Sequence, residues 1–149
     1  MAGEYAGHVP DGGDEKVRAR VAEVMFNESS ALGFWLGKAY KLLSPTTGEG
    51  YNCFRKPGDR VERNVRFGTE PGLSLIDGKP ALIMHYGDFE NPAGKADLTD
   101  EIRKLGEGLY LGVGTTARPD GTRVHFGHFA LSGPMGEWVG VDDEGAELK

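Results

Sequence analysis

Apolar residues near the start of the chain recur at the spacing of an amphipathic helix. Val17, Val21, Val24 and Met25 follow this spacing, and charged residues occupy many of the positions between them. Such a pattern places the apolar side chains on one helix face. Asp14 is a suitable N-cap, so we predict a helix that begins there and ends near residue 27. We interpret this helix as a cover packed over one end of the structure that follows.

From residue 31 onwards the pattern changes to short apolar runs separated by turn signals, which is typical of β-structure. Lys56-Pro57-Gly58-Asp59 suits a type II turn, Asp77-Gly78 suits a two-residue hairpin, and Pro119-Asp120-Gly121 marks a third turn. The predicted strands cover residues 35–43, 51–55, 60–67, 73–76, 80–88, 108–116, 123–132 and 137–141.

A second helix is predicted within residues 91–107, the longest interval without a strand. Leu98, Ile102 and Leu105 recur there at helical spacing, and Thr99 is a suitable cap. Residues 1–13 contain four glycines and a proline without periodicity, so we predict a flexible N-terminal arm.

Eight mostly antiparallel strands joined by hairpins predict an all-β fold with one or two short helices. An antiparallel up-and-down barrel of about eight strands is favoured because it removes sheet edges, although an open sandwich remains an alternative. Residues 14–149 then form one domain with an N-terminal helix. A barrel of this size holds one small ligand in its interior, so we expect the function to lie there.

Composition and charge exclude several function classes. The net charge is −6, and we find no basic run that would attract a nucleic-acid backbone. Glycine accounts for 24 of the 149 residues, which indicates many tight turns. Cys53 is the single cysteine, and neither a membrane-spanning stretch nor an apolar leader is evident. We therefore expect a cytoplasmic protein without nucleic-acid or membrane partners.

Two stretches resemble a group of bacterial lipocalin-like proteins. Gly33-Phe34-Trp35-Leu36-Gly37-Lys38 is similar to the Gly-x-Trp-x-Gly opening strand of lipocalin-like domains. The second stretch runs from Asp77-Gly78-Lys79-Pro80-Ala81-Leu82 to Tyr86, and then through Pro92, Asp100-Glu101-Ile102-Arg103 and Gly108-Leu109-Tyr110-Leu111-Gly112. The resemblance covers residues 31 to 133. It implies a calycin-type barrel around a small-molecule pocket, without implying a particular reaction.

Alternation along residues 80–88 gives two sets of candidate site residues. Tyr86 and Asp88 share one face with Leu82 and Met84, whereas His85 lies on the other face. If the first face lines the cavity, Tyr86 and Asp88 form a pair that can donate and accept protons. The alternatives are that Tyr86 is an ordinary core residue and that Asp88 caps a loop.

Two histidines near the end of the chain offer a different chemistry. His125 and His128 are three residues apart, so on a regular strand they point to opposite faces unless Gly127 forms a bulge. This spacing argues against a metal site. We favour His128 as the cavity residue, because it shares a face with Phe126 and other apolar residues, and we predict that it acts as an acid or base.

Cationic residues are the third source of candidate chemistry. Arg103 either forms a surface pair with Asp100 on the predicted helix or reaches the barrel mouth to bind a ligand. On the second interpretation it is a catalytic candidate, together with Tyr86, Asp88 and His128. The predicted ligand-binding residues are Trp35, Lys38, Tyr40, Asn52, His85, Tyr110 and Phe126.

The polar residues on predicted cavity strands favour a cofactor-free enzyme. Such an enzyme binds a hydrophobic molecule and uses acid/base chemistry for isomerisation, cyclisation or dehydration, as an isomerase, cyclase or lyase in small-molecule biosynthesis. Neither a phosphate-binding glycine motif nor a nucleophile elbow is present, so no cofactor is expected. The alternatives are a non-catalytic carrier of a lipophilic metabolite and an interaction domain using the acidic tail from Asp142 to Lys149. A homodimer is also compatible with the sequence.

Overall fold

The computed structural model describes residues 1–10 and 14–142. Within these residues, eight strands form a closed barrel in which each strand pairs with its neighbours in the chain, and β1 pairs with β8. Every pairing is antiparallel. The predicted all-β fold, an antiparallel up-and-down barrel of about eight strands, is therefore confirmed.

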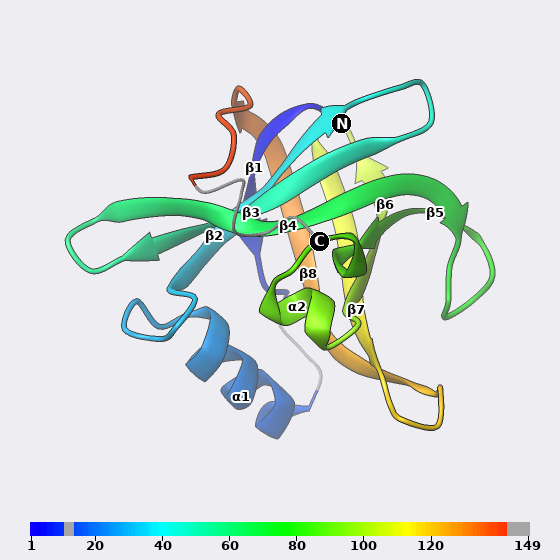
Figure 1. Ribbon diagram of the computed structural model, residues 1–149, viewed down its shortest axis with the longest axis horizontal. Coiled ribbons are helices and arrows are strands. Elements are labelled where there is room, and N and C mark those ends of the chain that lie inside the picture. Colours follow the sequence, from blue (N-terminus) through cyan, green and yellow to red (C-terminus); the bar gives the residue numbers. More distant parts are fainter. Residues whose placement is uncertain (11–13, 143–149) are drawn as a thin grey trace.

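The barrel carries two α-helices and one 3-10 helix among its described residues. Figure 1 shows α1 and α2 in the lower half of the view. The elements in chain order are β1 (Gly3–His8), α1 (Glu15–Met25), β2 (Phe34–Leu42), β3 (Gly48–Lys56), β4 (Arg60–Leu73), β5 (Pro80–His85), η1 (Tyr86–Asp88), α2 (Pro92–Lys95), β6 (Thr99–Gly106), β7 (Leu109–Ala117) and β8 (Arg123–Gly136).

Helix α1 begins where the sequence predicts. The Asp14 side chain accepts hydrogen bonds from the backbone N–H groups of Lys16 and Val17, at 2.9 and 3.1 Å. The helix ends at Met25, and none of its residues is fully buried. It is thus attached to the barrel by part of one face. Neither described helix is long and apolar enough to cross a membrane.

The prediction of a flexible arm is wrong for residues 3–8, which form strand β1. This strand pairs with β2 on one side and β8 on the other, and it contributes the buried Tyr5 to the core. Its glycines allow close packing: the ring of Trp35 lies against Gly7, where a Cβ atom would stand 2.5 Å from the ring. Residues 11–13 of the predicted arm lie outside the described residues.

The second predicted helix is also largely wrong. A single helical turn, α2, ends at Lys95, and β6 then pairs with β5 and β7. Ile102 is 3% exposed whereas Leu105 is 61% exposed, so these residues do not share a helical face. Cross-strand pairing on both sides outweighs the chance helical spacing of the leucines and isoleucine.

Two predicted strands are replaced by other structures. Residues 74–79 form the loop between β4 and β5, because Leu73 pairs directly with Pro80. Residues 137–141 cross the outside of the barrel, where the Trp138 ring packs 4.6 Å from that of Tyr51. The Tyr51 hydroxyl accepts a hydrogen bond from the backbone N–H of Val139. Side-chain contacts, rather than strand pairing, hold this segment.

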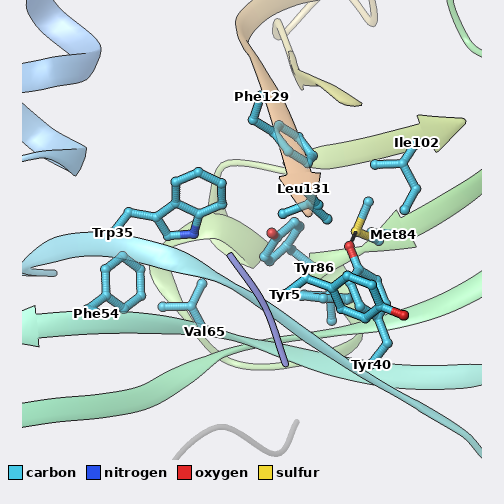
Figure 2. Close-up of a cluster of buried hydrophobic side chains, with 11 residues drawn as sticks. Tyr5, Trp35, Tyr40, Phe54, Val65, Met84, Tyr86, Ile102, Phe129 and Leu131 are labelled. Atoms are coloured by element: carbon cyan, nitrogen blue, oxygen red, sulfur yellow. Dashed lines mark hydrogen bonds between the residues drawn. The ribbon is translucent and has the colours of Figure 1, made fainter. Parts of the chain in front are cut away.

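The barrel interior contains one continuous core of aromatic and aliphatic side chains. Figure 2 shows Trp35, Phe54 and Val65 on one side of this cluster, and Tyr40 and Met84 on the other. The rings meet edge to face, as aromatic pairs in cores prefer. The side near Trp35 is where the interior is hollow.

Candidate functional site

A cavity of about 230 Å³ occupies the part of the barrel next to α1 and α2. Its wall is largely apolar and includes Phe26, Trp35, Phe54, Val65, Phe126 and Phe129. Helix α1 contributes Val21, Val24 and Met25, and α2 contributes residues near Pro92. The cavity is small compared with typical ligand sites of about 300–1,000 Å³. It therefore suits a small, mainly apolar molecule.

Four polar side chains, Lys38, Asn52, Tyr86 and Asp100, lie in this wall and form what we call the interior polar cluster. Each is at most 4% exposed. Lys38 Nζ lies 2.9 Å from Asp100 Oδ2, and the Tyr86 hydroxyl donates to the same oxygen at 2.9 Å. Lys38 also donates to Tyr86 Oη and, at 2.9 Å, to Asn52 Oδ1. The cluster thus joins strands β2, β3 and β6 to the start of η1.

Asn52 holds the other members in place. Its Oδ1 accepts hydrogen bonds from Lys38 and from the Trp35 indole N–H, while its Nδ2 donates to the Val65 carbonyl and to Tyr86 Oη. Both N–H groups and both acceptor positions of this amide are therefore occupied. A side chain with no spare hydrogen-bonding capacity positions its neighbours rather than binding a ligand.

The ammonium group of Lys38 is equally well satisfied. It donates hydrogen bonds to Asn52 Oδ1 and Tyr86 Oη, and its charge is paired with Asp100 Oδ2 at 2.9 Å. Four aromatic rings, including those of Trp35 and Phe129, have their centroids 5.1–5.7 Å from Nζ. Ring faces at this distance attract a cation, which further stabilises the charged amine in an apolar wall.

Asp100 is the member with an open position. Its Oδ2 accepts a hydrogen bond from Tyr86 and pairs with the Lys38 ammonium group, whereas its Oδ1 has no hydrogen-bond partner among the described residues and is not sealed from solvent. A Cβ atom at Gly114 would stand 2.6 Å from Oδ1, so the missing side chain there makes room for the carboxylate. Asp100 thus presents one free acceptor oxygen at the cavity wall.

Burial fixes the protonation state of Tyr86. Desolvation raises its pKa well above the ordinary value, and the nearby negative charge of Asp100 raises it further. Tyr86 is therefore a neutral hydroxyl that donates to Asp100 and accepts from Lys38 and Asn52. Because Lys38 and Tyr86 both contact Oδ2 of Asp100, protonation of this carboxylate would weaken both interactions.

An irregularity in strand β2 explains how the Trp35 side chain reaches the interior polar cluster, where it donates to Asn52. Trp35 and Lys38 are three residues apart, and alternation alone would place them on opposite faces of β2. The pairing of β2 with β3 shifts register between Trp35 and Gly37, which indicates a bulge. Both side chains therefore face the interior, and both line the cavity.

A similar irregularity in the pairing of β7 with β8 brings the rings of the two histidines of β8 close together. The register with β7 shifts between Gly114 and Thr115, and the His125 and His128 rings lie 5.9 Å apart. His128 is exposed and lines the cavity as well as an outer groove beside α1, whereas His125 lines the groove alone. Among the described residues, no group of three potential ligands could hold a metal ion.

The cavity contains only part of the predicted site. Two of the four catalytic candidates, Tyr86 and His128, line it, and Tyr86 belongs to the interior polar cluster. The predicted ligand-binding residues that line the cavity are Trp35, Lys38, Asn52 and Phe126.

Asp88 and His85 do not line the cavity. The chain turns into η1 at Tyr86, so strand alternation no longer applies, and the exposed Asp88 carboxylate lies against the backbone of Gly68. His85 lies 3.1 Å from Glu70 at an exposed position. The shared face assumed for Tyr86 and Asp88 is therefore wrong.

Arg103 is also outside the cavity. On strand β6 it points away from Asp100 and forms a bidentate pair with Asp77 in the β4–β5 loop. This pair lowers the pKa of the exposed Asp77 carboxyl. Both predictions for Arg103, a pair with Asp100 and a place at the barrel mouth, are wrong because each assumed a helix.

Tyr40 and Tyr110 pack in the core instead of lining the cavity. The Tyr40 hydroxyl donates to the sulfur of Met84 at 3.2 Å. The ring of Tyr110 meets that of Tyr5 edge to face. These tyrosines fill the interior beyond the cavity, which limits the size of a bound molecule.

Asp100 is the cluster member that sequence reasoning missed. Read as a strand, residues 99–106 place Asp100 and Ile102 on one face, opposite Gly112 and Gly114 of the next strand. A glycine directly opposite a carboxylate, here Gly114 opposite Asp100, is a signal that could have found it. No family model, curated protein or solved structure matches this chain, so the site rests on its own geometry.

Proposed function

We propose that the protein binds a small, mainly apolar molecule in the barrel cavity and catalyses a cofactor-free proton transfer on it. Asp100 is the base in this proposal, and Lys38 and Tyr86 stabilise the charge that results. The observation that carries it is the free Oδ1 of a buried carboxylate at the wall of an apolar cavity. The resemblance to lipocalin-like proteins is in keeping with a ligand inside a barrel.

The cost of the buried ion pair supports a role beyond stability. Moving two charges out of water is expensive, and apolar residues of similar size at such positions are often neutral or stabilising. Lys38 and Asp100 are nevertheless 3% and 4% exposed at the edge of an open cavity. A barrel that only stored a lipid would be served by an apolar wall.

The chemistry follows from the hydrogen bonds around Asp100. When Oδ1 takes a proton from the bound molecule, the carboxylate becomes neutral and the molecule becomes an anion. The Lys38 ammonium, 2.9 Å from Oδ2, then balances the charge of this anion. The Tyr86 hydroxyl is released from a charged acceptor and can donate to the anion instead.

The fate of the proton distinguishes the possible reactions. Return of the proton from Asp100 to another atom gives isomerisation, and its delivery to a departing hydroxyl gives dehydration. Attack of the anion on a carbonyl or conjugated double-bond carbon of the same molecule closes a ring as the π bond breaks, and Asp100 returns the proton to the atom that receives the π electrons. Each route conserves the proton and needs only the groups already in the cavity.

Intrinsic fluorescence can test binding and turnover together. The chain has two tryptophans, and Trp35 lines the cavity while Trp138 packs outside the barrel. A Trp138→Phe variant therefore reports on the cavity alone. We would titrate it with apolar metabolites and recover each bound compound for mass and chromatographic comparison.

Matched variants identify the catalytic groups. We expect conversion to be lost in Asp100→Asn and reduced at least ten-fold in Tyr86→Phe. Tyr40→Phe is the control, because Tyr40 is an equally buried tyrosine outside the cavity, and it should retain full activity. Binding with unchanged ligand in every case would instead establish a carrier, and the absence of binding would contradict both functions.

A further inference from the structure

We infer that the polar end of the bound molecule is a neutral hydrogen-bond donor, such as a hydroxyl group, and not a carboxylate. This inference deepens the proposed function and rests on it. It follows from counting which hydrogen-bonding positions of the interior polar cluster are still open.

The open position that the cluster offers to an incoming ligand is an acceptor. Lys38 donates to Asn52 and Tyr86 and pairs its charge with Asp100, the amide N–H groups of Asn52 are both engaged, and the Tyr86 hydroxyl donates to Asp100. Oδ1 of Asp100 is the position left without a partner among the described residues. A ligand that donates a hydrogen bond completes the cluster without breaking any existing contact.

Charge favours a neutral ligand. Lys38 and Asp100 already neutralise each other at 2.9 Å. A carboxylate would place its charge beside that of Asp100. A cation would add a second positive charge near the ammonium group. Inside an apolar wall, either charge would also lose its hydration.

The geometry matches the proposed chemistry. A hydroxyl that donates to Oδ1 is already hydrogen-bonded to the base that would remove its proton. The remaining wall, with Phe54, Phe126 and Phe129, suits an aromatic or aliphatic body. The ligand class is therefore a small neutral alcohol, phenol or enol with one apolar body.

Four probes with one ring system separate the possibilities. We would measure binding of 2-naphthol, 2-methoxynaphthalene, 2-naphthaldehyde and 2-naphthoate to the full chain by calorimetry at neutral pH. We expect 2-naphthol to bind at least ten-fold more tightly than the ether or the aldehyde, which can only accept hydrogen bonds, and naphthoate to bind most weakly. Equal binding of naphthol and ether would overturn the inference while leaving the cavity as a ligand site.

The Asp100→Asn variant provides a second measurement. It leaves the Lys38 charge without its partner, so we expect naphthoate to gain at least ten-fold in affinity and naphthol to lose its advantage over the ether. An unchanged order of the four probes in a folded variant would contradict the role of Asp100. If no probe binds the wild-type protein, the proposed function itself fails, which distinguishes that failure from a failure of donor recognition.

Discussion

Tyr86 connects the interior polar cluster through one hydroxyl group. The variant Tyr86→Phe removes it and deprives Lys38, Asn52 and Asp100 of one partner each. Because these groups stay buried, we expect the free energy of unfolding to fall by about 1–3 kcal/mol. Tyr40→Phe loses a single bond to sulfur and should cost less than about 1 kcal/mol. Urea denaturation measures both values, and equal losses would contradict the cluster's role in stability.

Cys53 illustrates a polar group buried outside the site. Desolvation raises the pKa of its thiol to about 12, and the Glu4 carboxylate adds to this effect. The native protein therefore holds this proton more tightly than the unfolded chain, in which the thiol has a pKa of about 8.5. Its contribution to stability is complete below that pH and is lost as the pH rises towards 12.

The alkaline stability of the protein tests this effect. We expect the free energy of unfolding to fall between about pH 8.5 and pH 9.5, and Cys53→Ala to make this fall shallower. The range stays below the ordinary pKa of tyrosine, about 10, so that Tyr51 contributes little. An identical slope in both proteins, measured by urea denaturation across the range, would show that the thiol is not responsible.

Gly114 links a backbone position to the site. A methyl group there would stand 2.6 Å from Asp100 Oδ1, and the buried carboxylate has little room to move. We expect Gly114→Ala to weaken binding of 2-naphthol at least ten-fold, measured by calorimetry. Gly106→Ala is the matched control, since nothing lies within 4 Å of the added Cβ, and it should bind like wild type. Unchanged binding in Gly114→Ala would place the ligand away from Oδ1.

Among the elements, those with strong local signals could be predicted from the sequence. Asp14 and the apolar stripe specify α1, and the turn dipeptides delimit most strands. Strand β1 was missed because its glycines and short length carry no periodicity. Strand β6 was missed because Leu98, Ile102 and Leu105 follow a helical spacing by chance. Only pairing with distant strands specifies β1 and β6, and this information is nonlocal.

The site was predictable to a similar degree. Lys38 and Asn52 could be placed inside by alternation, since they lie opposite each other in the pairing of β2 with β3. Trp35 reaches the same interior through a bulge, which alternation does not reveal. Asp100 could not be assigned once its segment was read as a helix, and Arg103 was misplaced for the same reason. One wrong element therefore removed Asp100 from the candidate site and added a surface arginine.

Helix α1 is a weakly attached element that lines the cavity. It has no fully buried residue, and Val17 and Val24 are each more than 40% exposed. Removing its N-cap with Asp14→Ala should destabilise the helix by about 1 kcal/mol, which corresponds to roughly five-fold faster amide exchange. The melting temperature of the barrel should not change. Amide hydrogen exchange measures this change in α1, and Lys16→Ala is the control. An equal increase of the exchange rate in α1 and in β3 would contradict local opening of the helix.

At the scale of the whole molecule, closure of the barrel makes the cavity possible. The interior polar cluster is contributed by β2, β3 and β6 together with the residue that follows β5, so its geometry depends on the entire ring of strands. Closure depends in turn on β1, which pairs with β2 and β8 and buries Tyr5. The segment with the weakest sequence signal is therefore essential to the site.

Deletion of residues 1–8 tests this dependence. Without β1, the edges of β2 and β8 lose their partners and the core loses Tyr5, so we expect loss of 2-naphthol binding and association through the exposed edges. Size-exclusion chromatography and calorimetry measure these two effects. The control is His8→Ala, which keeps β1 and removes only an exposed side chain that contacts Ser132. A monomeric deletion variant with wild-type binding would show that seven strands suffice and that the cavity does not depend on closure.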